Sequence, residues 1–207
     1  MTRYVARPPP IRVFMNQSIA TPADGRRNRT VLTRQQIVQA FIALIGQGHV
    51  APTAEDVSAR ANVGLRTVFR HFEDMETLYR EVNTEIRETV SSMLRLPYVA
   101  SDWRARVNEN IAIRCMLYER LTPFFIAAQV HRHESAFIEE SIHQGVHLER
   151  TILLALLPKE IARDKARFEA IFMTLSPDNW IRLRREQGLS VVMAQQAIGV
   201  AVTALLR

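Results

Sequence analysis

The chain has 207 residues, of which 47% are hydrophobic and 23% charged, and its formal net charge is +6. This composition is too apolar for a disordered chain, and the length allows a sizeable core. Because Cys115 is the single cysteine, an intramolecular disulfide is excluded. The sequence shows neither a signal-peptide pattern nor an apolar run long enough to span a membrane, so we expect a cytoplasmic protein with no membrane partner.

The positive charge is concentrated at the N-terminus. Residues 1–32 hold six arginines and one acid, which leaves a charge of only +1 for residues 33–207. Three consecutive prolines from Pro8 and the lack of periodicity predict a disordered basic arm over 1–32. Such an arm can attract phosphate, lie on an anionic membrane surface, or serve only as a soluble leader. Translation can start at Met1 or at Met15.

A helix-turn-helix pattern follows the arm. Apolar residues at helical spacing predict a helix that begins at Thr33 and ends at Gly46–Gly48. Thr53 and Asp56 form a capping-box pattern at the start of a second helix. The run 62–64, Asn-Val-Gly, predicts a short turn, and a third helix is expected from 65 to about 72.

The rest of the chain also has helical periodicity, with no strand pattern. A long fourth helix is expected to follow Asp74, and further helices are expected at 101–120, 123–133, 135–157, 160–175 and 189–206, with a shorter one near 178–186. The fold class is therefore predicted to be all-α. We divide the chain into the arm at 1–32, a helix-turn-helix DNA-binding domain at 33–80, and a ligand-binding and dimerisation domain at 81–207.

The helix-turn-helix region resembles a known family. Spacing and residue types over 33–79 match from end to end in the segments Thr33–Ala40, Pro52–Val57, Ala61–Phe72 and Leu78–Tyr79. Together they resemble the DNA-binding domain of the tetracycline-repressor (TetR) family of transcriptional regulators. The resemblance implies a homodimer that binds double-stranded DNA at a palindromic operator and responds to a small-molecule effector, usually as a repressor.

The resemblance also implies which residues contact DNA. Arg66 and Thr67 occupy positions that read base edges or neighbouring phosphates, and an arginine can bond bidentately to guanine. Phe69 replaces a more usual tyrosine, and Met75 a common lysine. Because the domain 33–80 has five basic and five acidic residues, we expect arginines of the arm to supply the missing charge. The candidate DNA-binding residues are Thr53, Gly64, Leu65, Arg66, Thr67, Phe69, Arg70, His71, Arg26, Arg27 and Arg29.

The C-terminal part contains candidates for an effector pocket and a dimer interface. An apolar cavity with a few polar groups is typical of small-molecule sites, although the same residues can form an ordinary core. The candidate pocket residues are Trp103, Cys115, Tyr118, Phe125 and Gln129. The last helix is apolar on nearly every side, and the resemblance implies that the last two helices pair with those of a second copy.

Two other functions are compatible with parts of the sequence. A helical small-molecule binding protein with a non-functional DNA-binding motif is the main alternative, because the motif is neutral and carries Phe69 and Met75. A metal-dependent helical enzyme is the third, since Glu140, His143 and His147 share a helix face. The second half of such a metal site is missing from the sequence, and no nucleophile or phosphate-loop motif is present. We therefore expect no metal, no cofactor and no enzyme activity.

Overall fold

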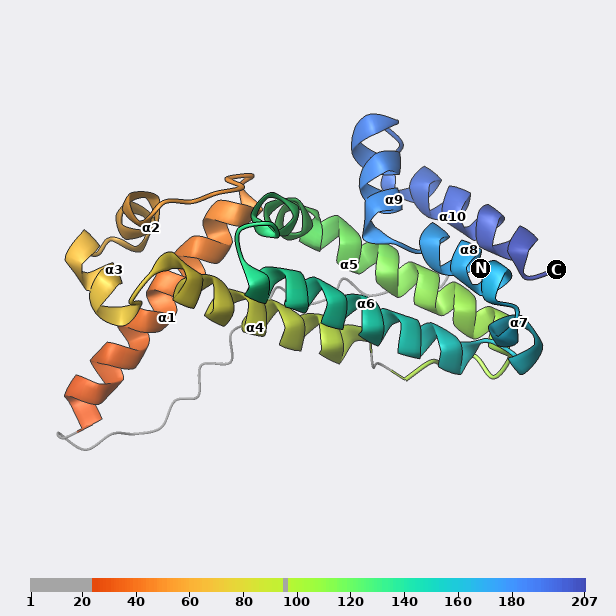
Figure 1. Ribbon diagram of the computed structural model, residues 1–207, viewed down its shortest axis with the longest axis horizontal. Coiled ribbons are helices and arrows are strands. Elements are labelled where there is room, and N and C mark those ends of the chain that lie inside the picture. Colours follow the sequence, from red (N-terminus) through yellow and green to blue (C-terminus); the bar gives the residue numbers. More distant parts are fainter. Residues whose placement is uncertain (1–23, 95–96) are drawn as a thin grey trace.

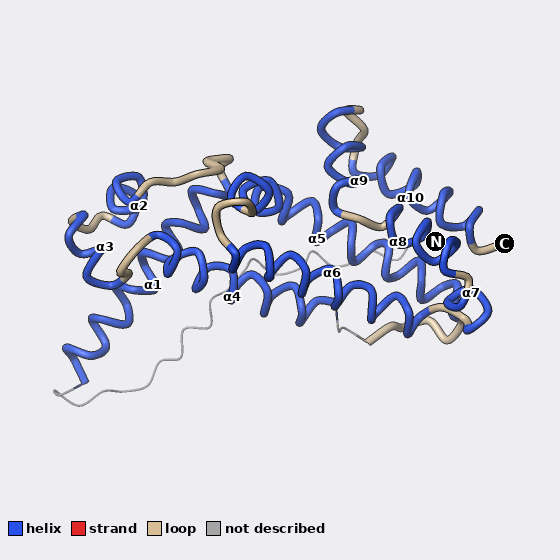
Figure 2. The backbone as a smooth tube through the Cα atoms, viewed as in Figure 1, coloured by secondary structure: helices blue, strands red, loops and turns tan. Residues whose placement is uncertain are grey.

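The computed structural model describes residues 24–94 and 97–207, and within these ranges it contains helices and no strand (Figure 1, Figure 2). The predicted all-α fold class is confirmed. The helices of the first part of the chain are α1 (Asp24–Gly46), α2 (Ala54–Ala61), α3 (Leu65–His71) and α4 (Met75–Leu94). Those of the second part are α5 (Trp103–His131), α6 (Ala136–Leu156), α7 (Lys159–Arg163), α8 (Lys165–Thr174), α9 (Pro177–Ile181) and α10 (Val191–Leu205), with a π-helix, η1 (Arg182–Glu186), after α9.

The first helix begins earlier than its sequence indicated. We expected a disordered segment to 32, but α1 starts at Asp24, and the prediction for residues 1–23 lies outside the described residues. After Gly25 the segment contains neither proline nor glycine up to Gly46. The hydroxyl of Thr33 also donates to the carbonyl of Arg29 at 2.9 Å, within the helix. The helical conformation therefore continues through the basic segment, although its polar residues bury no core surface.

Two boundaries in the second part were also predicted wrongly. Residues 101–120 and 123–133 form one helix, α5, with Pro123 inside it. Proline removes one backbone hydrogen bond from a helix, yet Leu121 and Thr122 are buried here and the Thr122 hydroxyl donates to the carbonyl of Tyr118 at 2.7 Å. Conversely, the segment 160–175 is divided into α7 and α8, because Asp164 caps α8 by accepting from the amide of Arg167 at 3.1 Å.

The helices enclose two hydrophobic cores. The first core lies among α1–α4 and contains Ile37, Phe41, Val57, Val68 and Phe72, each at most 1% exposed. The second core is formed by α5, α6, α7, α8, α9 and α10 with the end of α4. Two partly buried side chains, Ile86 of α4 and Phe124 of α5, pack against both cores. The small helices α2 and α3 lie at one end of the molecule, and α8 and α10 lie at the other (Figure 1).

Among the described residues, no helix is both long enough and apolar enough to cross a membrane.

Candidate functional site: the helix-turn-helix and a cavity among the helices

The second and third helices form a helix-turn-helix whose local geometry follows from a few residues. The Thr53 hydroxyl accepts from the amide of Asp56 at 3.2 Å, while the amide of Thr53 donates to the Asp56 carboxylate at 2.9 Å. This is the predicted capping box. Asn62 ends α2 in the left-handed conformation, at φ 51° and ψ 46°. Gly64 has an ordinary extended backbone at φ −69°, so only Asn62 uses the conformational tolerance of this turn.

Helix α3 separates an inner face from an outer one. Val68 is buried in the core together with Phe72, the residue that follows the helix. The outer face carries an exposed set of predicted DNA-binding residues: Leu65, Arg66, Phe69 and Arg70. Phe69 is 47% exposed, which is unusual for a phenylalanine in a folded protein. The chain therefore presents two arginines and one aromatic ring on a helix that has no core function on that side.

The other candidates on the motif are less accessible. Thr67 and His71 are half-buried, and the hydroxyl of Thr53 is engaged in the capping box. Burial, followed by the charges of Arg70 and Arg34, lowers the pKa of His71 below its ordinary 6.5. The imidazole of His71 is therefore neutral at pH 7 and adds no positive charge to this surface.

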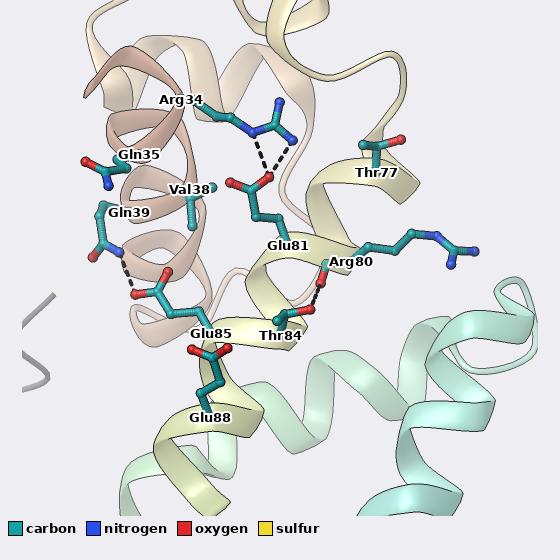
Figure 3. A pocket seen from close by; sticks show the side chains of 10 residues that line it. All are labelled: Arg34, Gln35, Val38, Gln39, Thr77, Arg80, Glu81, Thr84, Glu85 and Glu88. Carbon is teal, nitrogen blue, oxygen red and sulfur yellow. Dashed lines mark hydrogen bonds and ion pairs between the residues drawn. The ribbon is translucent and has the colours of Figure 1, made fainter. Parts of the chain in front are cut away.

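Arg34 has a structural role that the sequence did not indicate. Its guanidinium lies 4.1 Å from the centre of the Phe72 ring and donates to both the backbone carbonyl of His71 and the carboxylate of Glu81, with 2.7 Å between Nε and Glu81 Oε2. Figure 3 shows this ion pair in the groove between α1 and α4, together with the 2.9 Å hydrogen bond from Gln39 to Glu85. Arg34 thus joins α1, the end of α3 and α4, and its charge is neutralised by Glu81.

The structure describes the side chains of some, but not all, of the arginines in the basic segment. Arg27 and Arg29 are exposed on the first turns of α1, which extend past α3 at the end of the molecule (Figure 1). Arg26 belongs to the same helix, but its side chain lies outside the described residues. The exposed cations of α1 and those of α3 therefore lie on the same domain.

Direct contacts join the helix-turn-helix region to the second part of the chain. The Tyr79 hydroxyl lies 3.1 Å from Nε2 of His131, and the Ser135 hydroxyl donates to the Glu76 carboxylate at 2.9 Å. Nearby, the guanidinium of Arg80 lies 4.4 Å from the centre of the Phe137 ring. Helix α4 is therefore held against the end of α5 and the start of α6, so movement of α4 must be coupled to these two helices.

A cavity of about 880 Å³ lies beside these contacts, among α1, α4, α5 and α6, with α8 and the start of α9 at one end. This volume is within the range of small-molecule sites. The predicted pocket residues Tyr118, Phe125 and Gln129 line it, whereas Trp103 and Cys115 do not. The two exceptions have a simple cause: Cys115 is buried in the second core and Trp103 packs against that core at the first turn of α5.

Residues of both cores line the cavity. Phe41 and Val82 belong to the first core, while Leu117 and Leu121 belong to the second. A molecule in the cavity would therefore directly contact residues of the first core, which holds the helix-turn-helix together. Sequence periodicity did not predict this position, since it identifies the inward face of each helix but not which faces enclose a space.

A buried polar network lies behind the cavity wall, to which its members Tyr118 and Glu149 belong. Arg114, 1% exposed, donates to Glu149 Oε2 at 2.6 Å, to the hydroxyl of Tyr118 at 3.0 Å and to Oδ1 of Asn110 at 2.8 Å. Burial, and then the Glu149 carboxylate, raise the pKa of Tyr118 well above its ordinary value, so its hydroxyl stays protonated. The charges of Arg114 and Glu149 compensate each other, which is required for ionised groups inside a protein.

The histidines considered as metal ligands are not assembled into a site. In the described part of the chain, no three His, Cys, Asp or Glu side chains are placed to hold a metal ion. His143 instead lies 3.2 Å from the carboxylate of Glu139, its neighbour one turn earlier in α6.

At the far end from α3, α10 and α8 expose apolar side chains. Val192 is 63% exposed, Met193 52% and Val200 72%, and Met173 of α8 is 65% exposed. The inner side of α10 is occupied by Ala194, Ile198 and Val202, which are buried in the second core. The helix therefore has a second apolar face with no partner among the described residues.

The described residues thus form an all-helical protein with two parts. The first is a helix-turn-helix with an exposed outer face, and the second is a larger set of helices beside a cavity. No protein-family model and no curated protein matches this sequence. The fold is similar to a solved structure from Mesorhizobium loti MAFF303099, described as that of "a putative TetR-family transcriptional regulator". The similarity covers 86% of this chain and 96% of the other, with a TM-score of 0.63 and 15% sequence identity. The chain thus has the all-α fold of that regulator.

Proposed function

We propose that this protein is a homodimeric, ligand-responsive transcription regulator that binds a palindromic operator in double-stranded DNA. The observation that carries the proposal is the division of α3 into two faces. Its inner side packs through Val68, while Arg66, Phe69 and Arg70 are exposed together on its outer side. A short helix that presents arginines to solvent after a tight turn fits the major groove of B-DNA.

The residue types on α3 suggest how the groove is read. Neither Arg66 nor Arg70 forms an ion pair with another described residue, so both guanidinium groups are available for guanine or phosphate. Phe69 has no hydroxyl to offer a phosphate, but an aromatic ring can pack against a thymine methyl group. We therefore propose that Arg66 reads guanine and that Phe69 contributes an apolar contact.

The first turns of α1 supply the electrostatic attraction that the neutral motif lacks. Arg26, Arg27 and Arg29 precede the motif, and the last two are exposed. Replacing all three with alanine is expected to weaken DNA binding and to make the salt dependence shallower, by about 0.9 in the logarithmic slope for each phosphate that is no longer neutralised. An unchanged slope would show that these arginines do not contact DNA.

Two copies are proposed to associate through the exposed apolar faces of α8 and α10. A dimer places two α3 helices on successive major grooves, which explains why a palindromic operator is expected. A ligand in the cavity would change the packing of α4 and so the separation of the two α3 helices, which weakens DNA binding. Repression is the proposed outcome of operator binding, because occupancy alone blocks a promoter.

The test is selection of bound sequences from a random duplex pool with the purified full-length protein. We expect enrichment of an inverted repeat, and we expect Arg66→Ala to lose a guanine preference within each half-site. Arg163→Ala is the matched control, since Arg163 is an exposed arginine on α7 at the opposite end of the molecule (Figure 1). It should select the same repeat as the unmodified protein.

The same experiment distinguishes the alternative function. If folded, dimeric protein enriches no sequence even at low salt, the DNA-binding proposal is wrong. The neutral charge of 33–80 and the absence of a hydroxyl at Phe69 would then favour a helical small-molecule binding protein whose motif no longer binds DNA.

A further inference from the structure

Asn83, a polar residue of α4 that lines the cavity, has a buried side-chain oxygen with no hydrogen-bond partner among the described residues. Its amide nitrogen likewise has no acceptor among the described residues, although Asn83 lines the cavity. Buried polar groups in native proteins are normally paired, so an unpaired one requires an explanation.

The apolar residues that line the cavity indicate the chemical character of a ligand that would pair with Asn83. Large hydrophobic side chains from four helices surround the cavity, among them Ile86, Leu121, Phe124, Phe125, Ile142 and Phe172. Contact with these residues is favourable for an apolar or aromatic molecule and unfavourable for a polar one.

The charged groups of the wall do not provide a site for an ionised ligand. Among the described residues, its one cation is Arg87, which is exposed and donates to Gln144 at 2.5 Å. Glu149 is already compensated by the buried Arg114, and Glu88 and Asp178 are exposed to water. A carboxylate ligand would find no unpaired buried cation, and a buried ammonium would find no unpaired buried anion.

We propose that the ligand of this cavity is an uncharged, largely apolar molecule with a hydroxyl or amide group that hydrogen-bonds to the side-chain amide of Asn83. Oδ1 has almost no accessible surface, so the ligand hydroxyl accepts from Nδ2, and Oδ1 is reached only when the side-chain amide turns. This inference rests on the proposed ligand response and adds the chemical class of the ligand and its anchoring residue.

The position of Asn83 gives that hydrogen bond a regulatory consequence. Asn83 follows Val82, which is buried in the core of the DNA-binding motif, and lies one turn after Tyr79, whose ring packs on Phe41. A ligand held at Asn83 therefore bears on α4 at the level where this helix contacts α1. The ligand can shift the equilibrium between two positions of α4 only by the difference between its affinities for those two positions.

The experiment uses equilibrium dialysis of the full-length protein with four probes that share one aromatic body. These are biphenyl, biphenyl-4-ol, biphenyl-4-carboxylate and biphenyl-4-ylmethylammonium, at pH 7. We expect biphenyl-4-ol to bind about tenfold more tightly than each of the other three, as one additional hydrogen bond implies. Equal or tighter binding of either charged probe would overturn the assignment, as would binding of no probe.

The role of Asn83 is tested with a near-isosteric change. Asn83→Leu should reduce the affinity for biphenyl-4-ol about tenfold and leave the affinity for biphenyl unchanged within twofold. Asn108→Leu, at an exposed position of α5 that does not line the cavity, is the matched control. If Asn83→Leu does not change the ratio of the affinities for biphenyl-4-ol and biphenyl, Asn83 is not the residue that anchors the hydroxyl. If Asn83→Leu does not fold, the four-probe comparison on the unmodified protein still decides the ligand class.

Operator selection on the same preparation separates this inference from the DNA-binding proposal. Protein that selects an inverted repeat but fails the probe test would overturn the ligand class alone. Protein that passes the probe test but selects no sequence would overturn DNA binding and leave the ligand assignment supported.

Discussion

The hydroxyl of Tyr79 lies 3.1 Å from Nε2 of His131, and the ring of Tyr79 meets that of Phe41 edge-on, with 4.9 Å between the ring centres. One side chain of α4 therefore contacts the first hydrophobic core on one side and the last turn of α5 on the other. It also lines the cavity. A change in the cavity that displaces Tyr79 must alter at least one of these contacts, so this residue physically connects the two proposed sites.

The hydrogen bond between Tyr79 and His131 can be measured with a double-mutant cycle of Tyr79→Phe and His131→Ala. Burial raises the pKa of Tyr79 to about 12, so the hydroxyl remains protonated near neutral pH. We expect a coupling free energy of about 1 kcal/mol from urea denaturation at one fixed protein concentration. A coupling near zero would show that the two residues do not interact in solution.

The turn of the helix-turn-helix depends on the left-handed backbone of Asn62. Asn62→Ala is expected to lower the free energy of unfolding by about 1 kcal/mol, since a Cβ without a polar side chain is disfavoured at φ 51°. Asn62→Gly should cost less, because glycine adopts this conformation freely. Asn108→Ala on α5 serves as the control and should change stability little. Equal losses for Asn62→Ala and Asn62→Gly would contradict this explanation.

Stability should fall in acid partly because of Glu119. Hydrogen bonds from Arg184 lower the pKa of Glu119 below its ordinary 4.5, with Trp180 Nε1 as a further donor at 3.1 Å. Because the folded pKa is the lower one, this stabilisation is complete above pH 4.5 and is lost as the pH falls through the folded pKa. Glu119→Gln should therefore lose less stability between pH 7 and pH 3 than the unmodified protein does.

Urea denaturation at both pH values measures that difference. Glu186→Gln is the control, since Glu186 approaches Arg182 only to 4.0 Å and both side chains are about two-thirds exposed. If the Glu119→Gln protein shows the full acid loss of the unmodified protein, Glu119 is not a source of the pH dependence.

Cys115 should be chemically inert in the folded protein. It is 2% exposed, and burial raises the pKa of its thiol to about 12, so very little thiolate exists at pH 8. Ellman's reagent should not react with native protein and should release one equivalent of thiolate per chain in urea, because the chain has a single cysteine. Rapid reaction without denaturant would mean that α5 opens easily.

The apolar face of α10 should be required for dimerisation. Val200→Glu places a charge on a residue that is 72% exposed in the single chain and would be desolvated in the proposed interface. We expect the protein to become monomeric by sedimentation while its circular dichroism stays helical. Val99→Glu is the control, since Val99 is 94% exposed outside the helices. A Val200→Glu protein that remains dimeric would place the interface elsewhere.

Several features followed directly from local sequence signals. The capping box at Thr53, the turn over 62–64 and the third helix that starts at 65 were predicted as the structure has them. Each depends on residues at most four positions apart, where backbone geometry and helical period determine the outcome. The predicted helix start at Thr33 and the predicted break before Pro123 were wrong, because polar composition and a proline are weak local signals that the continuing helix overrides.

The sequence by itself determined the all-helical class, the helix-turn-helix and the outward position of Arg66, because all three depend on spacing along one or two neighbouring helices. Only the tertiary structure decided that Trp103 lies away from the cavity, that Arg114 is buried against Glu149, and that Asn83 has no partner among the described residues. These facts depend on which helices pack together and on how far along their axes they contact, and helical periodicity carries no information about either. The packing of α4 against α1, α5 and α6 is what brings separate amphipathic helices together around one cavity.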